Sequence, residues 1–189
     1  MKRTSDAMDT PEFLALNGRE YAILRLLGKG KGGYTYLAER DGSRYALKQI
    51  HHEPCDYYQF GDKLASELRD YETLSALNIP IPALLDADRE GERLLKELLP
   101  GETVYQLVLG NALEPWHLDQ ARALSQTLRD AGLNIDWFPT NFIPKDGILY
   151  YVDYECNPYM DQWSFENWGI LYWSRTPKLA AYAKEQGDI

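Results

Sequence analysis

The chain has 189 residues, a formal net charge of −9, 44% hydrophobic residues and 13% aromatic residues. This length suits one domain or two small lobes that share an interface, and the hydrophobic content predicts a packed core rather than a disordered chain. Lys and Arg do not cluster, so we expect no nucleic-acid partner. No apolar run is long enough to span a membrane, and no secretory signal opens the sequence. We therefore expect a cytoplasmic protein.

The predicted elements make the first half of the chain rich in strands and the second half mostly helical. In chain order, the sequence predicts strands over 21–28, 34–40 and 44–50 with a hairpin turn at 41–43, a helix over 62–77, an extended segment over 78–88, one or two strands within 91–102, a helix over 114–133, a hairpin around Asp146 and Gly147, and a Trp-rich helical tail. We expect five strands and one helix in the first half, and a seam near residues 99–104.

The segment "GKGKGG" places Gly28, Gly30 and Gly33 in the pattern G-x-G-x-x-G. This pattern alone is also typical of a flexible turn, and in a dinucleotide-binding fold a helix would follow it. Here a strand follows, and a glycine loop between two strands is the arrangement that lays backbone N–H groups over nucleotide phosphates in protein kinases. Lys29 and Lys31 add positive charge at the same place.

Lys48 lies in the predicted strand "RYALKQI". Side chains alternate along a strand, so Ala46, Lys48 and Ile50 share one face. The small Ala46 leaves room for a flat ring, and the neighbouring lysine supplies a charge for phosphates. The alternative is an edge-strand lysine whose ammonium group reaches solvent.

A lysine on such a face needs an anionic partner. The helix predicted over 62–77 has an apolar stripe formed by Leu64, Leu68, Tyr71 and Leu74. Helical rotation places Glu67 inside this stripe and Glu72 beyond its edge. We therefore expect Glu67 to pair with Lys48, although a solvated side chain is the ordinary alternative for a single helical carboxylate.

The stretch "NIDWFPTN" and the later "YYVDYE" place three oxygen-bearing side chains among apolar and aromatic residues. Mg²⁺ prefers oxygen ligands, often one or two carboxylates beside phosphate oxygens, so Asn141 and Asp153 are candidate metal ligands. Asp136 is the candidate group to orient an attacking hydroxyl and accept its proton. The alternative is structural, with Asp136 and Asn141 forming a turn and Asp153 capping a strand end.

These segments resemble the protein kinase superfamily, in its small bacterial or atypical serine/threonine branch, over roughly residues 20–157. "GKGKGGYTYLAE" resembles the glycine loop, "YALK" the third-strand lysine motif, "IDWFPTN" the catalytic loop and "VDYE" the Asp-Phe-Gly motif. "KELLPGE" resembles the hinge, which implies that backbone groups of Glu97 and Leu99 bind adenine. The resemblance implies an α+β, minimal two-lobed kinase-like fold, with an N-terminal extension over 1–19, an N-lobe over 20–99 and a reduced helical C-lobe over 100–189.

The implied function is ATP- and Mg-dependent phosphoryl transfer to a hydroxyl of a protein or small molecule. The expected catalytic residues are Asp136 and Lys48, the expected metal ligands are Asn141 and Asp153, and the expected nucleotide contacts are Gly28, Lys29, Gly30, Gly33, Ala46, Lys48, Glu67, Glu97 and Leu99. Thirty-four residues follow Glu155, which leaves little room for a peptide-binding platform, so an aminoglycoside- or sugar-type kinase is one alternative. Phe138 stands where protein kinases have a catalytic-loop lysine, and a nucleotide-binding pseudokinase scaffold is the other alternative.

Overall fold

A computed structural model describes residues 10–53 and 61–188, so residues 1–9 of the expected N-terminal extension lie outside it. The chain divides into two compact units. Unit 1 comprises the chain up to Ser66 together with Ala83–Leu98, and unit 2 comprises Glu67–Pro82 together with the chain from Leu99 onward. The mixed composition of strands and helices confirms the α+β class. The lobe boundaries expected at 20–99 and 100–189 stay a prediction.

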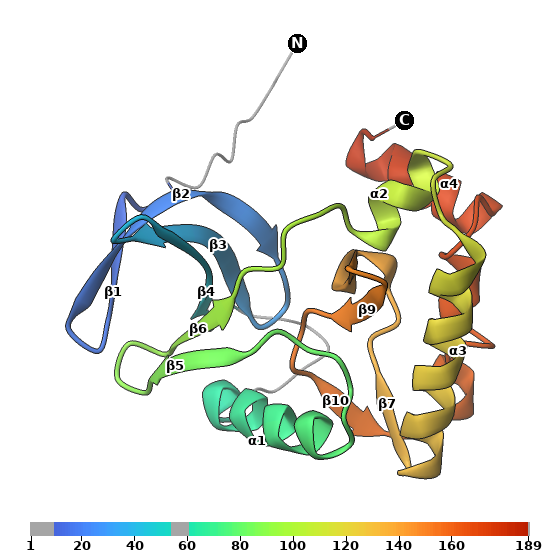
Figure 1. The fold of residues 1–189 in the computed structure, drawn as a ribbon, viewed down its shortest axis with the longest axis horizontal. Helices are drawn as coiled ribbons and strands as arrows, with labels where there is room; N and C mark the ends of the chain where they lie inside the picture. The colour runs from blue at the N-terminus through green and yellow to red at the C-terminus, as the bar shows by residue number, and fades with distance from the viewer. Residues whose placement is uncertain (1–9, 54–60, 189) are drawn as a thin grey trace. The chain divides into compact units, whose positions relative to one another are not determined.

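Unit 1 is built on a six-stranded antiparallel sheet with the strand order β1-β2-β3-β4-β6-β5 (Figure 1). The strands are β1 (Phe13–Leu16), β2 (Arg19–Lys29), β3 (Gly33–Arg40), β4 (Ser43–Ile50), β5 (Leu84–Asp88) and β6 (Arg93–Glu97). The expected hairpin is confirmed, because Asp41 and Gly42 join β3 to β4 with φ angles of 51° and 74°. The sheet has one strand more than the five expected, since β1 lies within the segment assigned to the extension.

The two faces of this sheet have different roles. One face carries the core of unit 1, formed by Leu16, Tyr21, Ala38, Leu47 and Leu95. Since Leu47 packs in this core, its neighbours Ala46 and Lys48 lie on the other face, as the alternation predicted. Cross-strand partners share a face, so Lys96, which pairs with Ala46, lies on the same side.

Unit 2 combines helices with two short antiparallel strand pairs. Its elements are α2 (Val104–Leu109), α3 (Pro115–Asp130), β7 (Leu133–Ile135), η1 (Pro139–Asn141), β8 (Phe142–Lys145), β9 (Ile148–Tyr151), β10 (Cys156–Pro158), η2 (Asp161–Trp163), η3 (Gly169–Leu171) and α4 (Pro177–Gln186). Helix α1 (Lys63–Ala76) begins in unit 1 and continues into unit 2. The helices expected over 62–77 and 114–133 are confirmed, and the hairpin at Asp146 and Gly147 joins β8 to β9.

The Trp-rich tail is only partly the regular helical segment expected from the sequence. Between residues 161 and 171 it forms only the 3₁₀ segments η2 and η3, and a regular helix begins at Pro177. The tail follows the shape of the core: a Cβ atom at Gly169 would lie 2.7 Å from Cβ of Trp137, so only glycine fits there. Helix α2 was also missed, although Thr103 and Gln106 form the capping box that marks its start.

The core of unit 2 is rich in aromatic side chains. Trp137 stacks on Phe142 at a centroid distance of 5.6 Å, and Trp173 meets Phe142 edge-on at 4.9 Å. The indole N–H of Trp173 donates to the carbonyl oxygen of Trp137 at 2.8 Å. The chain immediately after Asp136 is thereby fixed in the core.

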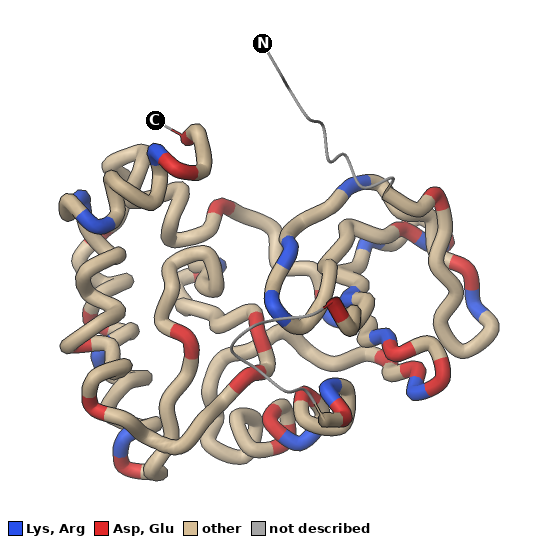
Figure 2. Tube along the Cα trace, turned by 180° about the vertical axis from the view of Figure 1, so that it is seen from behind, with Lys and Arg blue, Asp and Glu red and all other residues tan. Residues whose placement is uncertain are grey.

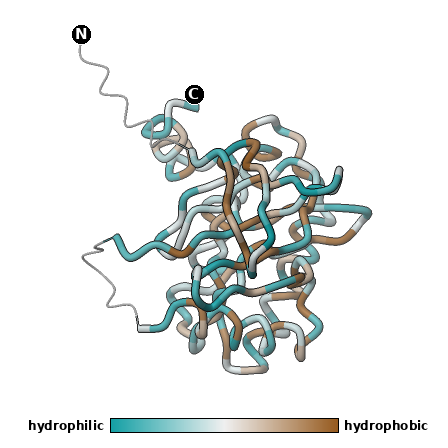
Figure 3. The backbone as a smooth tube through the Cα atoms, turned by 90° about the vertical axis from the view of Figure 1, so that its left-hand side faces the viewer, coloured by the Kyte–Doolittle hydropathy of each residue, from teal (hydrophilic) through white to brown (hydrophobic). Residues whose placement is uncertain are grey.

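No helix within the described ranges is long and apolar enough to cross a membrane. Hydrophobic and hydrophilic stretches alternate along the trace (Figure 3), and Lys and Arg are interspersed with Asp and Glu (Figure 2).

Candidate functional site

Hydrogen bonds hold the glycine loop between β2 and β3 against the end of β4. The N–H of Gly30 donates to the carbonyl oxygen of Gly33 at 2.9 Å, and the N–H of His51 donates to that of Gly32 at 3.3 Å. The Nε2 atom of His51 lies 3.1 Å from the carbonyl oxygen of Gly30. Since a carbonyl oxygen only accepts, Nε2 carries the proton in this contact.

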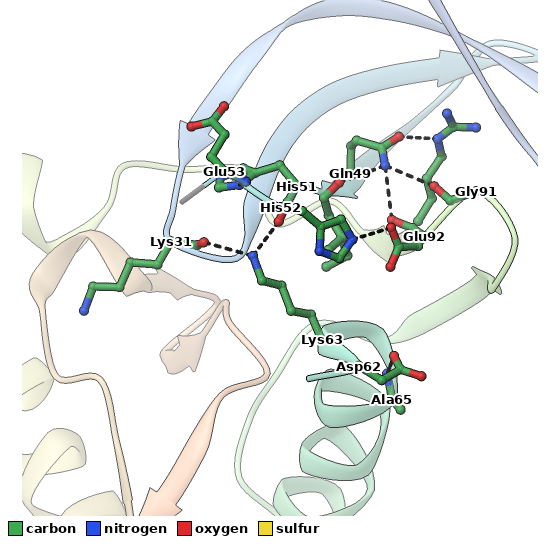
Figure 4. Close-up of polar contacts among 12 residues, drawn as sticks. Lys31, Gln49, His51, His52, Glu53, Asp62, Lys63, Ala65, Gly91 and Glu92 are labelled. Carbon is green, nitrogen blue, oxygen red and sulfur yellow. Dashed lines mark hydrogen bonds and ion pairs between the residues drawn. The ribbon is translucent and has the colours of Figure 1, made fainter. Parts of the chain in front are cut away.

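Lys63, in the first turn of α1, adds a second anchor for the same loop (Figure 4). Its ammonium group donates to the carbonyl oxygen of Lys31 at 3.4 Å and to that of His51. The side chain is 5% exposed, so these bonds are made away from water. Neither Lys63 nor His51 was predicted as a site residue, because nothing in the local sequence separates them from surface residues.

Gly33 ends the loop in tight contact with β4. A Cβ atom there would lie 2.5 Å from the carbonyl oxygen of Gln49 and 3.3 Å from Cε of Lys48. The absence of a side chain therefore brings the loop backbone next to the lysine. Lys48 itself is 7% exposed, which argues against the solvent-reaching alternative.

Lys29 makes contacts of its own at the exposed end of β2. Its ammonium group lies 3.0 Å from a carboxylate oxygen of Glu53 and 5.1 Å from the ring centre of Tyr34. Hydrogen bonding to Tyr34, and then to Glu53, raises the pKa of Lys29 above its ordinary value. A phosphate at this position would have to compete with Glu53 for the lysine.

The expected adenine contacts lie at the end of β6. The N–H of Glu97 donates to the carbonyl oxygen of Ala83 at 2.8 Å, so the sheet already uses this donor. A nucleotide contact at Glu97 would have to use another of its backbone groups. Leu99 is buried and belongs to unit 2. Lys96, just before Glu97, is only 3% exposed.

The two glutamates of α1 differ in burial as predicted. Glu67 is 9% exposed, whereas Glu72 is exposed. The apolar stripe therefore includes Glu67, and the pairing of Glu67 with Lys48 stays a prediction.

In unit 2, the pairing of β7 with β10 brings Asp136 close to Glu155. Ile135 pairs with Cys156 in antiparallel register. Asp136 directly follows Ile135 and Glu155 directly precedes Cys156, so the two acidic residues leave the same end of the strand pair.

A second pairing brings Asn141 to the same place. The strands β8 and β9 form a hairpin, and beyond it the N–H of Val152 donates to the carbonyl oxygen of Asn141 at 2.9 Å. Asp153 is the next residue after Val152. Two strand pairings thus gather Asp136, Asn141 and Asp153 from a stretch of eighteen residues.

Hydrogen bonds between residues close in sequence fix the backbone around these side chains. Asp136 is exposed, and its Oδ1 accepts the N–H of Phe138 at 3.0 Å. The Nδ2 of Asn141 donates to the carbonyl oxygen of Asp136 at 3.4 Å, and the Oδ1 of Asp153 accepts the N–H of Tyr154 at 2.9 Å. The structural alternative is therefore realised in part: Asp136 and Asn141 do shape a turn.

Tyr151 lies at the end of β9 and contacts the segment that leads into β10. Its hydroxyl group is buried and donates to the carbonyl oxygen of Glu155 at 3.0 Å. Burial raises the pKa of Tyr151 well above its ordinary value, and the negative charges of Asp153, Asp136 and Glu155 raise it further. The sequence marked Tyr151 only as a strand residue, yet the charges of three carboxylates act on it.

Asn141 and Asp153 offer few ligands to a metal ion, so a metal bound here would need further ligands from a nucleotide or water. Within the described residues, no group of three or more His, Cys, Asp and Glu side chains could hold a metal ion. Asp153 could supply one carboxylate, and Asn141, whose amide nitrogen donates to the carbonyl oxygen of Asp136, could supply an amide oxygen. Mg²⁺ is commonly bound by one or two protein oxygens together with phosphate oxygens and water, so this pair fits a nucleotide-bound Mg²⁺.

Comparison with known proteins does not assign the chain to a family. No protein-family model matches the chain, and no curated protein shows significant similarity to it. The assignment of a function therefore depends on the residues described above.

Proposed function

We propose that the protein transfers the γ-phosphoryl group of ATP to a hydroxyl group in a Mg²⁺-dependent reaction. The observation that carries the proposal is a chain of backbone contacts: the Nδ2 of Asn141 donates to the carbonyl oxygen of Asp136, and the N–H of Val152, the residue before Asp153, donates to the carbonyl oxygen of Asn141. The anchored glycine loop beside Lys48 in unit 1 supports it independently. The reaction requires both sets of residues to act on the same nucleotide.

In this reaction the chain supplies binding groups and one base. The ammonium group of Lys48 and the N–H groups of the glycine loop other than that of Gly30, which donates to the carbonyl oxygen of Gly33, bind phosphate oxygens. Asn141 and Asp153 hold Mg²⁺, which neutralises charge on the phosphates when bound. Asp136 orients the acceptor hydroxyl and takes its proton. The acceptor oxygen forms a bond to the γ-phosphorus, the bond from that phosphorus to the bridging oxygen breaks, and ADP leaves.

The proposal has three forms, which differ in the molecule that accepts the phosphoryl group. An atypical serine/threonine protein kinase is the form that the sequence resemblance favours. The burial of Phe165, Trp173 and Leu179 reduces the surface that the last segment offers to a peptide, which favours a small-molecule kinase. A pseudokinase scaffold would bind ATP without transferring phosphate.

Three substitutions test the proposal against a matched control. We expect Mg-ATP, at about a hundred times its dissociation constant, to stabilise the wild-type fold by about 2.7 kcal/mol. Asp153→Asn should lose Mg-dependent binding and Lys48→Met should weaken it, whereas Asp136→Asn should bind ATP and lose phosphoryl transfer. Asp146→Asn, in an exposed turn, is the control and should change neither.

The readouts are thermal unfolding with ATP and Mg²⁺, and mass spectrometry of the protein and candidate acceptors. The absence of any stabilisation by millimolar Mg-ATP would contradict the proposal. Binding without transfer to any acceptor or to water would replace it with the scaffold.

A further inference from the structure

A row of four side chains crosses the face of the unit 1 sheet that lies opposite its core. Leu37 pairs with Ala46, Ala46 with Lys96 and Lys96 with Leu84, so the row runs through β3, β4, β6 and β5. Side chains directly opposite each other share a face, with Cβ atoms about 4.5–5.5 Å apart. Lys96 therefore lies between two apolar neighbours, and the small Ala46 is one of them.

Burial in this row is the reverse of the ordinary distribution. Lys96 is 3% exposed, whereas Leu37, Ala46 and Leu84 are each only partly buried. A lysine ordinarily carries its ammonium group into water, and apolar side chains are ordinarily covered. Here the cation is covered and part of the apolar surface is open. A flat apolar ring with a hydrogen-bond acceptor fits both features, because the ring covers the open surface and the acceptor meets the ammonium group.

Lys48 indicates which molecule carries such a ring. Lys48 pairs with Leu94, two residues before Lys96, so the two lysines are diagonal neighbours on one face, with Cα atoms about 7–8 Å apart. The glycine loop ends against Lys48, since a Cβ atom at Gly33 would lie 3.3 Å from its Cε. Phosphates bound by the loop and Lys48 therefore leave the base of the same nucleotide next to Ala46 and Lys96.

The ammonium group of Lys96 distinguishes purine bases by the group at carbon C6. An ammonium group has three N–H donors and no acceptor. Guanine and hypoxanthine have a carbonyl oxygen at C6, which accepts a hydrogen bond, whereas the amino group of adenine meets the ammonium group donor to donor. Lysine contacts the O6 and N7 acceptors of guanine in DNA recognition for the same reason. Burial increases the difference, because little water is present to take the place of a mismatched partner.

We infer that Lys96 determines the base specificity of the nucleotide site, so that a purine nucleotide with a carbonyl group at C6, such as GTP, binds more tightly than ATP. The inference rests on the proposed function for the position of the phosphates beside Lys48. It adds a residue that recognises the base and the class of base that this residue favours. One oxygen of the base needs only one of the three donors, so Lys96 keeps donors for protein partners as well.

Four nucleotides separate the group at C6 from the rest of the base. GTP and 2-aminoadenosine triphosphate both have an amino group at C2 and differ at C6, where GTP has the carbonyl. ITP and ATP differ at C6 in the same way and have no amino group at C2. With the full wild-type chain and Mg²⁺, isothermal titration calorimetry should give a dissociation constant about 10-fold lower for GTP and for ITP than for the amino partner of each.

Two substitutions of Lys96 test whether this side chain causes the preference. Lys96→Met should abolish it, because methionine has a long apolar side chain without donors. Lys96→Arg should keep it, because a guanidinium group also has donors only. Each preference is a ratio of two dissociation constants measured on one protein, so a partial loss of folded protein leaves it unchanged. Lys184→Met, at an exposed position of α4, is the matched control and should keep the wild-type ratios.

The outcomes distinguish base recognition from the proposed function. Equal or tighter binding of the amino partner in either pair, or an unchanged ratio in Lys96→Met, would overturn the role of Lys96 and leave the proposed function intact. Failure of all four nucleotides to bind would contradict both. A preference for the carbonyl at C6 without phosphoryl transfer would support the role of Lys96 and replace the proposed function with the scaffold.

Discussion

Burial, and then the negative charges of three acidic residues of unit 2, raise the pKa of Tyr151. Its hydroxyl group donates to the carbonyl oxygen of Glu155, and the charges of Asp136 and Asp153 act on it. Tyr154 makes a comparable buried bond, from its hydroxyl to the carbonyl oxygen of Pro82 at 2.7 Å. Substitution of each tyrosine in turn therefore distinguishes an effect on folding stability from an effect on the position of the carboxylates.

We expect Tyr154→Phe to lower the free energy of unfolding by about 1–3 kcal/mol, because it leaves the buried carbonyl oxygen of Pro82 without this donor, and Tyr151→Phe to lower it by about 0.5–1.5 kcal/mol, because the exposed Glu155 can turn its carbonyl oxygen to water. Only Tyr151→Phe should also reduce phosphoryl transfer, since only this hydroxyl holds the loop next to Asp136. Urea unfolding and transfer rates measure the two effects. Equal loss of transfer in both variants would assign Tyr151 a purely structural role.

The thiol of Cys156 gives a second prediction, on pH. Burial, and then the charge of Asp70, raise the pKa of the Cys156 thiol to about 11 from an ordinary 9.0. At pH 8 the thiolate fraction should therefore be about 100-fold below that of an ordinary cysteine. The unfolded chain loses this proton first, so the contribution to stability is complete below pH 9 and is lost as the pH rises toward 11.

Alkylation by iodoacetamide in a Cys55→Ser background checks this expectation. The folded protein should react with a midpoint near pH 11 and the urea-unfolded protein with a midpoint near 9. A folded midpoint near 9 would mean that the thiol is more solvated than the structure shows.

At the scale of elements, the glycine loop depends on backbone contacts more than on its charges. Gly33 touches β4 so closely that a Cβ atom would lie 2.5 Å from the carbonyl oxygen of Gln49. At Gly28 a Cβ atom would have no neighbour within 4 Å. Neither glycine has a positive φ angle, so the two positions differ in space and not in backbone strain.

We expect Gly33→Ala to destabilise unit 1 by about 1–3 kcal/mol and to weaken Mg-ATP binding, because the loop must move off β4 next to Lys48. Gly28→Ala should be within about 0.5 kcal/mol of wild type. Thermal unfolding and ATP titration measure both variants. Tolerance of alanine at both positions would show that the loop does not need its contact with β4.

At the scale of the whole molecule, the proposed reaction uses residues from both units. Unit 1 carries the loop and Lys48, and unit 2 carries Asp136, Asn141 and Asp153. A nucleotide that uses both sets should slow backbone hydrogen exchange in both units.

We therefore expect Mg-ATP to protect amides in two separate segments, 28–33 and 151–155, when exchange is followed by mass spectrometry. ATP without Mg²⁺ should protect the first segment more than the second, because Asp153 acts through the metal. Protection confined to one unit would contradict a shared nucleotide site.

Local pattern was sufficient for several features of this protein. Alternation placed Lys48 on the face opposite the core of unit 1, and helical rotation placed Glu67 in a buried stripe and Glu72 outside it. Turn residues located the β3–β4 and β8–β9 hairpins. These predictions held because periodicity and turn chemistry act between residues close in sequence.

Other features depended on contacts that no local pattern encodes. The strands β7 and β10 have three residues each, too few to show a period, yet their pairing brings Asp136 to Glu155. The tail was expected to be helical, but between residues 161 and 171 it follows the packing around Trp137, which excludes a side chain at Gly169.

The sequence by itself therefore determined the α+β class, the main elements and which candidate residues belong to which element. The tertiary structure alone decided that backbone contacts join the segments of Asp136, Asn141 and Asp153, that Lys63 anchors the glycine loop, and that Phe138 lines a hollow with α4. The physical reason is that none of these features follows from local periodicity. Lys63 and Phe138 meet segments distant in the chain, and strand pairs too short to show a period join the loops of Asp136 and Asp153. Such contacts are set by packing inside each unit, which depends on many residues at once.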